Sequence, residues 1–173
     1  MALELDRVDL MPVCAPPHKT IEADPGVEHR VAMCGAAVAD NPALGVSLVE
    51  VERGGSSYTI DTLRALRAQA PHDDLTWIMG GDQAHALPSW REPEGVLSLA
   101  WLGVAEREGL RRVDILASLH DLAGAPERIR FFDMPRIDLS SSLLRRRVAA
   151  GDPIRYLVPD AVRAHIEQER LYL

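Results

Sequence analysis

The sequence predicts an α/β fold with a mostly parallel β-sheet and helices on both faces. Short apolar segments of strand type alternate with helical segments along the whole chain. This alternation is typical of βαβ crossover units, which place their strands in parallel. A polar or aromatic residue suited to ligand binding also follows each expected strand. The length of 173 residues fits one domain, so we expect residues 1–173 to form a single domain.

The expected strands are short apolar runs bounded by turn-forming residues. In chain order they are Val8–Val13, Val46–Val51, Leu75–Met79, Leu97–Ala105 and Arg128–Phe132. Pro16 and Pro17 end the first strand, because proline fixes φ and cannot donate a backbone hydrogen bond. The second run alternates partly between apolar and polar residues, and the fourth has little helical periodicity. The glycine pair Gly80-Gly81 after the third strand allows close approach of backbone atoms.

The expected helices lie between these strands and at the C-terminal end of the chain. They cover Glu28–Asp40, Ile60–Ala70, a short segment after Asp82, Leu110–Leu122, a segment from Ser140, and Asp160–Glu169. Ser57 or Thr59 is expected to cap the second helix. Ser140 is expected to cap the helix that contains Arg145, because a serine oxygen accepts a first-turn N–H. The other N–H groups of that first turn, with the helix dipole, can bind an anion.

Composition narrows the class of protein. At 47% hydrophobic residues the chain can bury a core, and its net charge of −7 argues against a general nucleic-acid binder. The chain has no apolar run of about 18 residues, so we expect no membrane span. Cys14 and Cys34 fit no metal spacing, and we expect both to be reduced and partly buried in a cytoplasmic protein.

The candidate binding residues follow the expected strands one after another. They are Lys19, Thr59, Asp82, Arg107, and the pair Ser140 and Ser141. Because ligands bind beyond the carboxyl ends of parallel strands, we expect one site there for a phosphorylated ligand. Arg145 adds positive charge, and Trp90 offers a flat face for a ring. We can assign no nucleophile for covalent catalysis, and transfer at phosphorus by positioning and charge needs none.

Several segments resemble the motifs of one enzyme family in their order and spacing. They are Pro16-Pro17-His18-Lys19, His29-Arg30-x-x-Met33, residues 52–63, Gly81-Asp82, Leu87-Pro88-Ser89-Trp90, residues 139–145, Tyr156-Leu157-Val158-Pro159 and Leu171-Tyr172. Nearly end to end, the chain resembles the bacterial nicotinate-nucleotide adenylyltransferases. The resemblance implies a Rossmann-like nucleotidyltransferase fold and a role in NAD biosynthesis.

The resemblance also implies a reaction. ATP and nicotinate mononucleotide would give deamido-NAD and pyrophosphate, with Mg²⁺ accompanying ATP. Lys19 and Arg145 would bind phosphate, the Thr59 backbone would hold the nicotinate carboxylate, and Trp90 would stack on the pyridine ring. The remaining implied contacts are Tyr58, Gly81 and Asp82 for the substrate, and Ser140, Ser141, Arg145 and Arg107 for ATP. We expect a monomer or a homo-oligomer.

The chain departs from the family in two places. Arg107 matches, but the proline and aromatic residue that usually follow it are replaced in Arg107-Glu108-Gly109-Leu110. The family also begins with a strand and a G-G-T-F-D-P-x-H-x-G-H motif, which have no counterpart before Met1. We therefore expect this amino-acid sequence to be incomplete at its N-terminus, so that the sheet lacks its first strand. A polypeptide that starts at Met1 should show little adenylyl transfer.

Alternative interpretations stay open. A related adenylyltransferase could act on nicotinamide mononucleotide or a pantetheine phosphate, and a truncated remnant could bind nucleotides without catalysis. Single residues also have simpler explanations. Trp90 could be a packing residue, and Asp82 and Thr59 could be helix caps.

Overall fold

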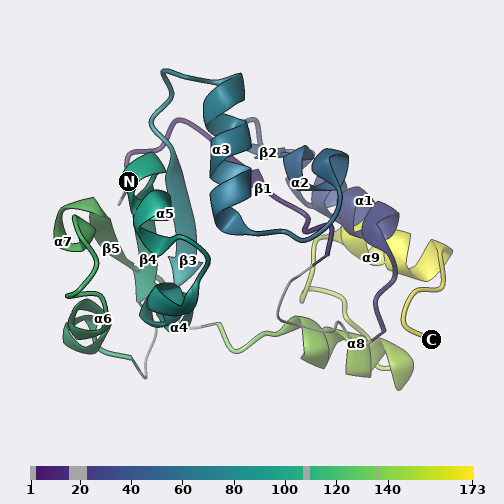
Figure 1. Cartoon of the computed structure of the whole chain (residues 1–173). Coiled ribbons are helices and arrows are strands. Elements are labelled where there is room, and N and C mark those ends of the chain that lie inside the picture. Colours follow the sequence, from purple (N-terminus) through teal and green to yellow (C-terminus); the bar gives the residue numbers. More distant parts are fainter. Residues whose placement is uncertain (1–2, 16–22, 107–109, 136) are drawn as a thin grey trace. The chain divides into compact units, whose positions relative to one another are not determined.

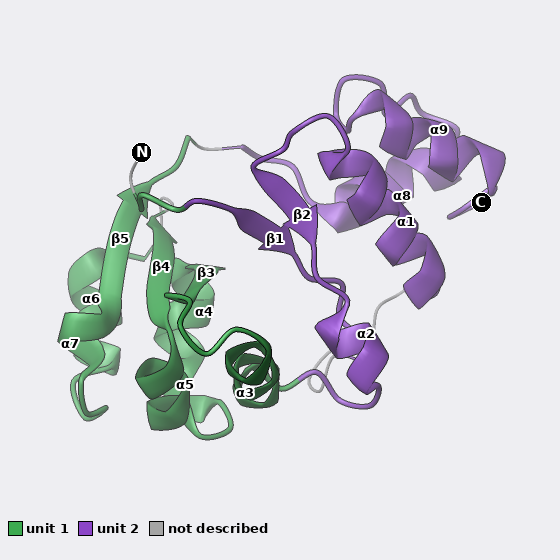
Figure 2. Cartoon of the chain, turned by 90° about the horizontal axis from the view of Figure 1, so that it is seen from above, with its two compact units in different colours: residues 1–5, 58–136 green, residues 6–57, 137–173 purple. Residues whose placement is uncertain are grey.

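The computed structural model describes residues 3–15, 23–106, 110–135 and 137–173. The chain forms two compact units, which Figure 2 shows in two colours. Unit 1 comprises Met1–Leu5 and Tyr58–Arg136, and unit 2 comprises Asp6–Ser57 and Ile137–Leu173. Each unit combines parallel strands with helices, so the α/β class predicted from the sequence is confirmed.

Unit 1 contains a parallel three-stranded sheet and helices (Figure 1). Its elements are α3 (Thr59–Gln69), β3 (Thr76–Gly80), α4 (Gly81–Ala86), the 3-10 helix η1 (Leu87–Ser89), α5 (Pro93–Leu99), β4 (Trp101–Glu106), α6 (Arg112–Ser118), α7 (Ala125–Arg128) and β5 (Ile129–Asp133). Strand β4 lies in the middle, and its Val104 is aligned with Met79 of β3 and Phe131 of β5.

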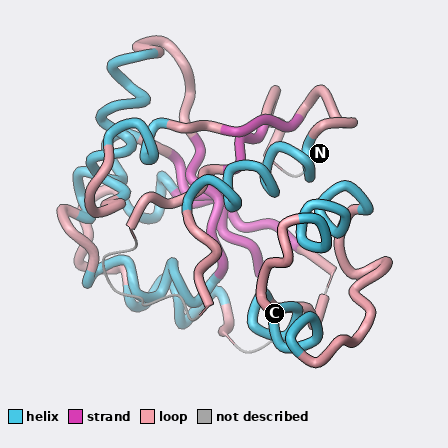
Figure 3. Tube along the Cα trace, turned by 90° about the vertical axis from the view of Figure 1, so that its right-hand side faces the viewer, coloured by secondary structure: helices cyan, strands magenta, loops and turns pink. Residues whose placement is uncertain are grey.

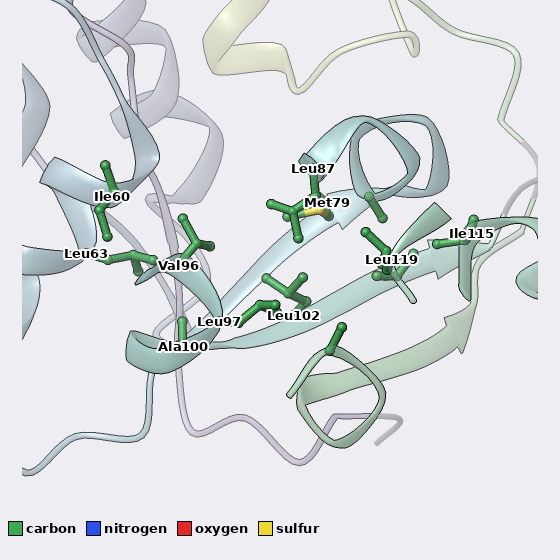
Figure 4. Close-up of a cluster of buried hydrophobic side chains, with 13 residues drawn as sticks. Ile60, Leu63, Met79, Leu87, Val96, Leu97, Ala100, Leu102, Ile115 and Leu119 are labelled. Atoms are coloured by element: carbon green, nitrogen blue, oxygen red, sulfur yellow. The ribbon is translucent and has the colours of Figure 1, made fainter. Parts of the chain in front are cut away.

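The core of unit 1 lies on one face of this sheet. Successive side chains of a strand point to opposite faces, so Leu102 and Val104 share a face, and neither is exposed. Both belong to a cluster of buried side chains that Figure 4 shows in part, with Ile60, Leu63, Val96, Leu97 and Ile115 from helices and Leu119 from the end of α6. On the opposite face, a Cβ at Gly103 would lie only 2.8 Å from Leu3 Cδ1. Glycine at this position therefore lets Leu3 pack on the strand.

Unit 2 combines two short parallel strands with helices. Its elements are β1 (Val8–Leu10), α1 (Val27–Val38), β2 (Leu44–Val46), α2 (Val49–Arg53), α8 (Ser141–Ala149) and α9 (Asp160–Gln168). Figure 3 colours the helices, strands and loops along the whole chain. The core of this unit contains Ile154, Val162, Ile166 and Leu171, with side chains of α1 and α8 packed against them.

Two of the expected strands are partly wrong. The expected strand Val46–Val51 contributes only Val46 to β2, and Val49–Arg53 is helix α2. The expected strand Leu97–Ala105 begins inside helix α5, and β4 starts at Trp101. Short apolar runs do not distinguish a buried helix from a buried strand by periodicity alone. Pro93 at the start of α5 was the missed signal, because proline is favoured in the first turn of a helix.

The described part of the chain contains no helix that is long and apolar enough to span a membrane. Cys14 and Cys34 are both free and partly buried, as expected from the sequence.

Candidate functional site

The N-terminus of α3 brings together two of the predicted substrate-binding residues. Tyr58 is the N-cap residue, and its carbonyl oxygen accepts hydrogen bonds from Thr62 N and Oγ1, each at 3.2 Å. Thr59 is the first helical residue, so its N–H has no acceptor within the helix. The expected side-chain cap from Ser57 or Thr59 is wrong, because Ser57 Oγ instead accepts the Cys14 N–H at 3.1 Å. The start of α3 can therefore offer a backbone donor to an anion.

The loop that carries Trp90 is tied to this helix start. Trp90 follows η1, its N–H donates to Leu87 O at 2.9 Å, and its half-buried ring packs against the core of unit 1. The guanidinium of Arg91 lies 5.0 Å from the centre of the Tyr58 ring, within cation–π range. Arg91 also pairs with Asp61 at 3.2 Å. Trp90 thus packs against the core, as the simpler interpretation predicts, and the next residue, Arg91, contacts the Tyr58 ring.

Four charged side chains of unit 1 form a network that the sequence analysis missed. Arg64 pairs with Glu92 at 2.6 Å and with Asp61 at 3.7 Å, and Asp61 also binds Arg91. The hydrogen bond from Arg64, together with the charges of Arg64 and Arg91, holds the pKa of Glu92 below its ordinary value. The pairs of Arg64 with Glu92 and of Arg91 with Asp61 join residues 28 and 30 positions apart, which no local pattern reveals. The available local signal was the i,i+3 spacing of Asp61 and Arg64.

Gly80 ends β3 and Gly81 begins α4, and side-chain atoms lie close to both glycines. A Cβ at Gly80 would lie 2.6 Å from Asp82 Oδ1, and a Cβ at Gly81 would lie 3.1 Å from Ile115 Cδ1. Asp82 is exposed in the first turn of α4, and the N-cap residue of α4 is Gly80. The interpretation of Asp82 as an N-cap is therefore wrong. The pair places an exposed carboxylate at the carboxyl end of β3.

The start of α8 carries the predicted ATP-binding residues of unit 2. Ser140 is the N-cap as expected, and its Oγ accepts the Leu143 N–H at 3.2 Å. Ser141 is exposed. Arg145 is half-buried one turn further along, where its Nη2 donates to Ser142 Oγ at 3.2 Å. This helix start therefore combines first-turn N–H groups, hydroxyls and a guanidinium, which is a set suited to phosphate.

The structure groups the predicted residues within each unit. Unit 1 holds Tyr58, Thr59, Gly81, Asp82 and Trp90, and unit 2 holds Ser140, Ser141 and Arg145. Lys19 and Arg107 lie outside the described residues. Among the residues that the structure describes, no group of three or more His, Cys, Asp or Glu side chains could hold a metal ion. The binding roles of all these residues stay predictions.

Comparison with known proteins places the chain in a family. The cytidylyltransferase-like family matches residues 2–147. A protein of Roseiflexus sp. (strain RS-1), named "Probable nicotinate-nucleotide adenylyltransferase", is 44% identical over 172 residues, which is 99% of this chain and 85% of that protein. A protein of the same name from Thermomicrobium roseum is 39% identical over 170 residues, which is 98% of this chain and 79% of that protein.

Solved structures show the same fold. The Plasmodium falciparum nicotinic acid mononucleotide adenylyltransferase complexed with NaAD has a TM-score of 0.74 and is 15% identical in sequence. The match covers 97% of this chain and 83% of that one. The family match and the 44% and 39% identities show that the chain belongs to the cytidylyltransferase-like family and to the nicotinate-nucleotide adenylyltransferases.

Proposed function

We propose that the protein transfers the adenylyl group of ATP to nicotinate mononucleotide, giving deamido-NAD and pyrophosphate. The observation that carries this proposal is the 44% identity to a relative of that name over 99% of the chain. The local structure supports it. In unit 1, the N-terminus of α3 and the neighbouring loop with Trp90 are suited to a charged ring. In unit 2, the N-terminus of α8 is suited to phosphate.

The reaction needs no nucleophile from the protein. A phosphate oxygen of the mononucleotide attacks the α-phosphorus of ATP, a new P–O bond forms, and the bond to the bridging oxygen of the β-phosphate breaks. Pyrophosphate leaves with the electron pair of that bond. In this proposal the protein positions both substrates and stabilises the negative charge that accumulates.

On the phosphate side, α8 would supply the donors. Ser140 Oγ accepts the Leu143 N–H and so holds the first turn in place, and its O–H is still able to donate to a phosphate oxygen. The first-turn N–H groups, the exposed Ser141 and the guanidinium of Arg145 are then the groups that would meet phosphate oxygens. Lys19 would add a second positive charge.

On the pyridine side, α3 would favour the acid over the amide. The N-terminus of a helix stabilises negative charge, and nicotinate has a carboxylate where nicotinamide has a neutral amide. The Thr59 N–H would bind that carboxylate, and the half-buried ring of Trp90 would stack on the pyridine. Tyr58, Gly81 and Asp82 would complete the substrate contacts.

Mg²⁺ would bind with ATP. Mg²⁺ commonly binds through substrate phosphates and keeps several waters, so it does not need a dedicated cage of protein ligands. The absence of a cluster of metal-ligating side chains within the described residues is compatible with this. When bound, Mg²⁺ would neutralise part of the phosphate charge. A cytoplasmic location and the choice between monomer and homo-oligomer stay predictions.

The test is a product assay with three acceptors. The full product of the gene is incubated with ATP, Mg²⁺ and nicotinate mononucleotide, nicotinamide mononucleotide or phosphopantetheine. We expect deamido-NAD and pyrophosphate in equal amounts, and at least a tenfold preference in kcat/KM for the acid. Faster turnover of either other acceptor would reassign the substrate. A protein that neither turns over an acceptor nor binds ATP in calorimetry would contradict the proposal.

A further inference from the structure

The two residues directly after Trp90 belong to a closed set of four ion pairs in unit 1, the charge network (Asp61, Arg64, Arg91 and Glu92). Two of the pairs join the loop to α3. Arg64 Nη2 lies 2.6 Å from Glu92 Oε2, and Arg91 Nη1 lies 3.2 Å from Asp61 Oδ2. The other two pairs close the network. Arg64 Nη1 lies 3.7 Å from Asp61 Oδ1, and Arg91 Nε lies 4.0 Å from Glu92 Oε1. Positive and negative charges therefore alternate around the network.

The pair of Arg64 with Glu92 has the geometry of a fork. Arg64 Nη2 donates to Glu92 Oε2 at 2.6 Å, and Arg64 Nη1 donates to Glu92 Oε1 at 3.2 Å. Two parallel bonds of this kind fix the direction of both side chains as well as their distance. Both side chains are about half exposed, and exposed pairs add little to global stability. We therefore expect the network to fix the position of the loop more than to stabilise the unit.

The backbone of Glu92 also needs support. Glu92 is the N-cap residue of α5, and its φ of 50° and ψ of 59° lie in the left-handed region. Its carbonyl oxygen accepts the Val96 N–H at 3.1 Å. A residue other than glycine is strained in this region and stays there when the surrounding structure holds it. The fork from Arg64 holds Glu92 by its side chain, and so fastens the turn directly after Trp90 to α3.

Apolar packing joins α3 and α5 independently of these charges. Ile60, which follows Thr59, is 1% exposed, and a Cβ at Gly95 of α5 would lie 2.9 Å from Ile60 Cδ1. Glycine at this position therefore lets Ile60 approach α5 closely. This contact remains when the charges are removed, so we expect variants of the charge network to fold.

We propose that Arg64 and Glu92 are positioning residues for nicotinate mononucleotide. Through the charge network they fix the residues directly after Trp90 relative to the N-terminus of α3, where Thr59 offers its N–H. A ligand that stacks on one group and binds the other with its carboxylate needs both groups at a fixed separation. This inference rests on the proposed function, because Trp90 and Thr59 are the residues expected to bind the pyridine ring and its carboxylate.

The experiment breaks the fork from each side and uses a matched control on the same helix. Arg64→Met and Glu92→Gln remove the two partners, singly and together. Arg67→Met is the control, because Arg67 also lies on α3 but binds at the other end of α5. Its Nη2 donates to Leu99 O at 3.1 Å, and its Nη1 donates to Asp73 O at 2.6 Å. Each variant is made in the full product of the gene.

For each protein we measure the melting temperature, kcat, the KM for both substrates, and amide exchange at Trp90 without ligand. We expect Arg64→Met and Glu92→Gln to speed exchange of the Trp90 N–H. Both should raise the KM for nicotinate mononucleotide about threefold to tenfold and keep the KM for ATP within about twofold of wild type. The double variant should lose no more than the larger single loss, because the two side chains act through one bond. Arg67→Met should lower the melting temperature and leave both KM values unchanged.

Arg64→Lys tests whether the fork itself matters. It keeps the charge but replaces the planar fork with one ammonium on a flexible stem, so its KM for nicotinate mononucleotide should lie between those of wild type and Arg64→Met. If Arg64→Met does not fold, Arg64→Lys takes its place with the smaller rise.

Three results would contradict the inference. An unchanged KM for nicotinate mononucleotide in folded Arg64→Met and Glu92→Gln would overturn it. An equal rise in the KM for both substrates would mean that the network merely supports the unit, and would overturn it as well. If wild type transfers no adenylyl group, the proposed function has failed and this inference fails with it, whereas an active wild type with unaltered variants means that this inference alone has failed.

Discussion

At the scale of single residues, Asp24 is expected to make the stability of unit 2 depend on pH. Its pKa is lowered in the folded protein, so its ion pair with Arg30 is fully present above its ordinary value of 3.8 and is lost as the pH falls through the lower folded value. We expect the melting temperature to fall between pH 5 and pH 3 and Asp24→Asn to flatten that fall. Thermal melts across this pH range test it. Asp40→Asn, at an exposed position after α1, is the control and should keep the slope of wild type.

Trp90 is a second residue whose role can be separated into packing and binding. Its half-buried ring packs against the core of unit 1, and stacking of a base on an aromatic ring contributes about 1–3 kcal/mol. We expect Trp90→Ala to raise the KM for nicotinate mononucleotide about tenfold or more, with little change in the KM for ATP. Trp90→Phe keeps a flat ring and should restore most of the affinity. If Trp90→Ala lowers only the melting temperature, the packing interpretation is sufficient.

At the scale of elements, α8 depends on its serine cap. Ser140 Oγ binds the Leu143 N–H, and replacing such a cap with alanine costs about 0.5–2 kcal/mol of helix stability. We expect Ser140→Ala to speed amide exchange in the first turn of α8 and to weaken ATP binding. Ser140→Asn supplies another capping oxygen and should restore both. Ser141→Ala leaves the cap intact and is the control, so its amide exchange should equal that of wild type. Identical amide exchange in all three variants would contradict the role of the cap.

The same elements show which features the sequence could predict. The start of α8 was predicted correctly because Ser140 gives a local signal that precedes the helix directly. Helix α2 was missed because Val49 and Glu50 are both buried, and two adjacent buried residues fit neither regular pattern clearly. The bonds of Arg30 to Val13 and Cys14 were also out of reach. They join residues 17 and 16 positions apart, and only the folded chain brings those together.

At the scale of the whole molecule, the parallel pairing was predictable and the division into two units was not. Alternation of strands and helices predicts crossover connections, and both sheets are indeed parallel. Tertiary packing decides which apolar faces of helices and strands share a core. A local sequence pattern does not show this. The core around Leu102 and the core around Ile166 have no residue in common. The expectation of a single domain over residues 1–173 stays a prediction.

Native-state hydrogen exchange can test whether the two cores open separately. Leu102 is fully buried in unit 1 and Ile166 is 7% exposed in unit 2. Truncating a buried leucine or isoleucine to alanine costs about 2–5 kcal/mol, which corresponds to roughly 30-fold to several-thousand-fold more frequent opening. Because the cores share no residues, we expect Leu102→Ala to speed exchange in β3, β4 and β5 and to leave α9 unchanged.

Ile166→Ala should produce the reverse pattern, with faster exchange in α1, α8 and α9 and no change in β4. Each variant is thereby the control for the other, because both remove a buried aliphatic side chain and differ in the core that they disturb. An equal rise in exchange throughout the chain in both variants would mean that the two units unfold as one cooperative domain. That result would support the single-domain prediction and contradict independent opening.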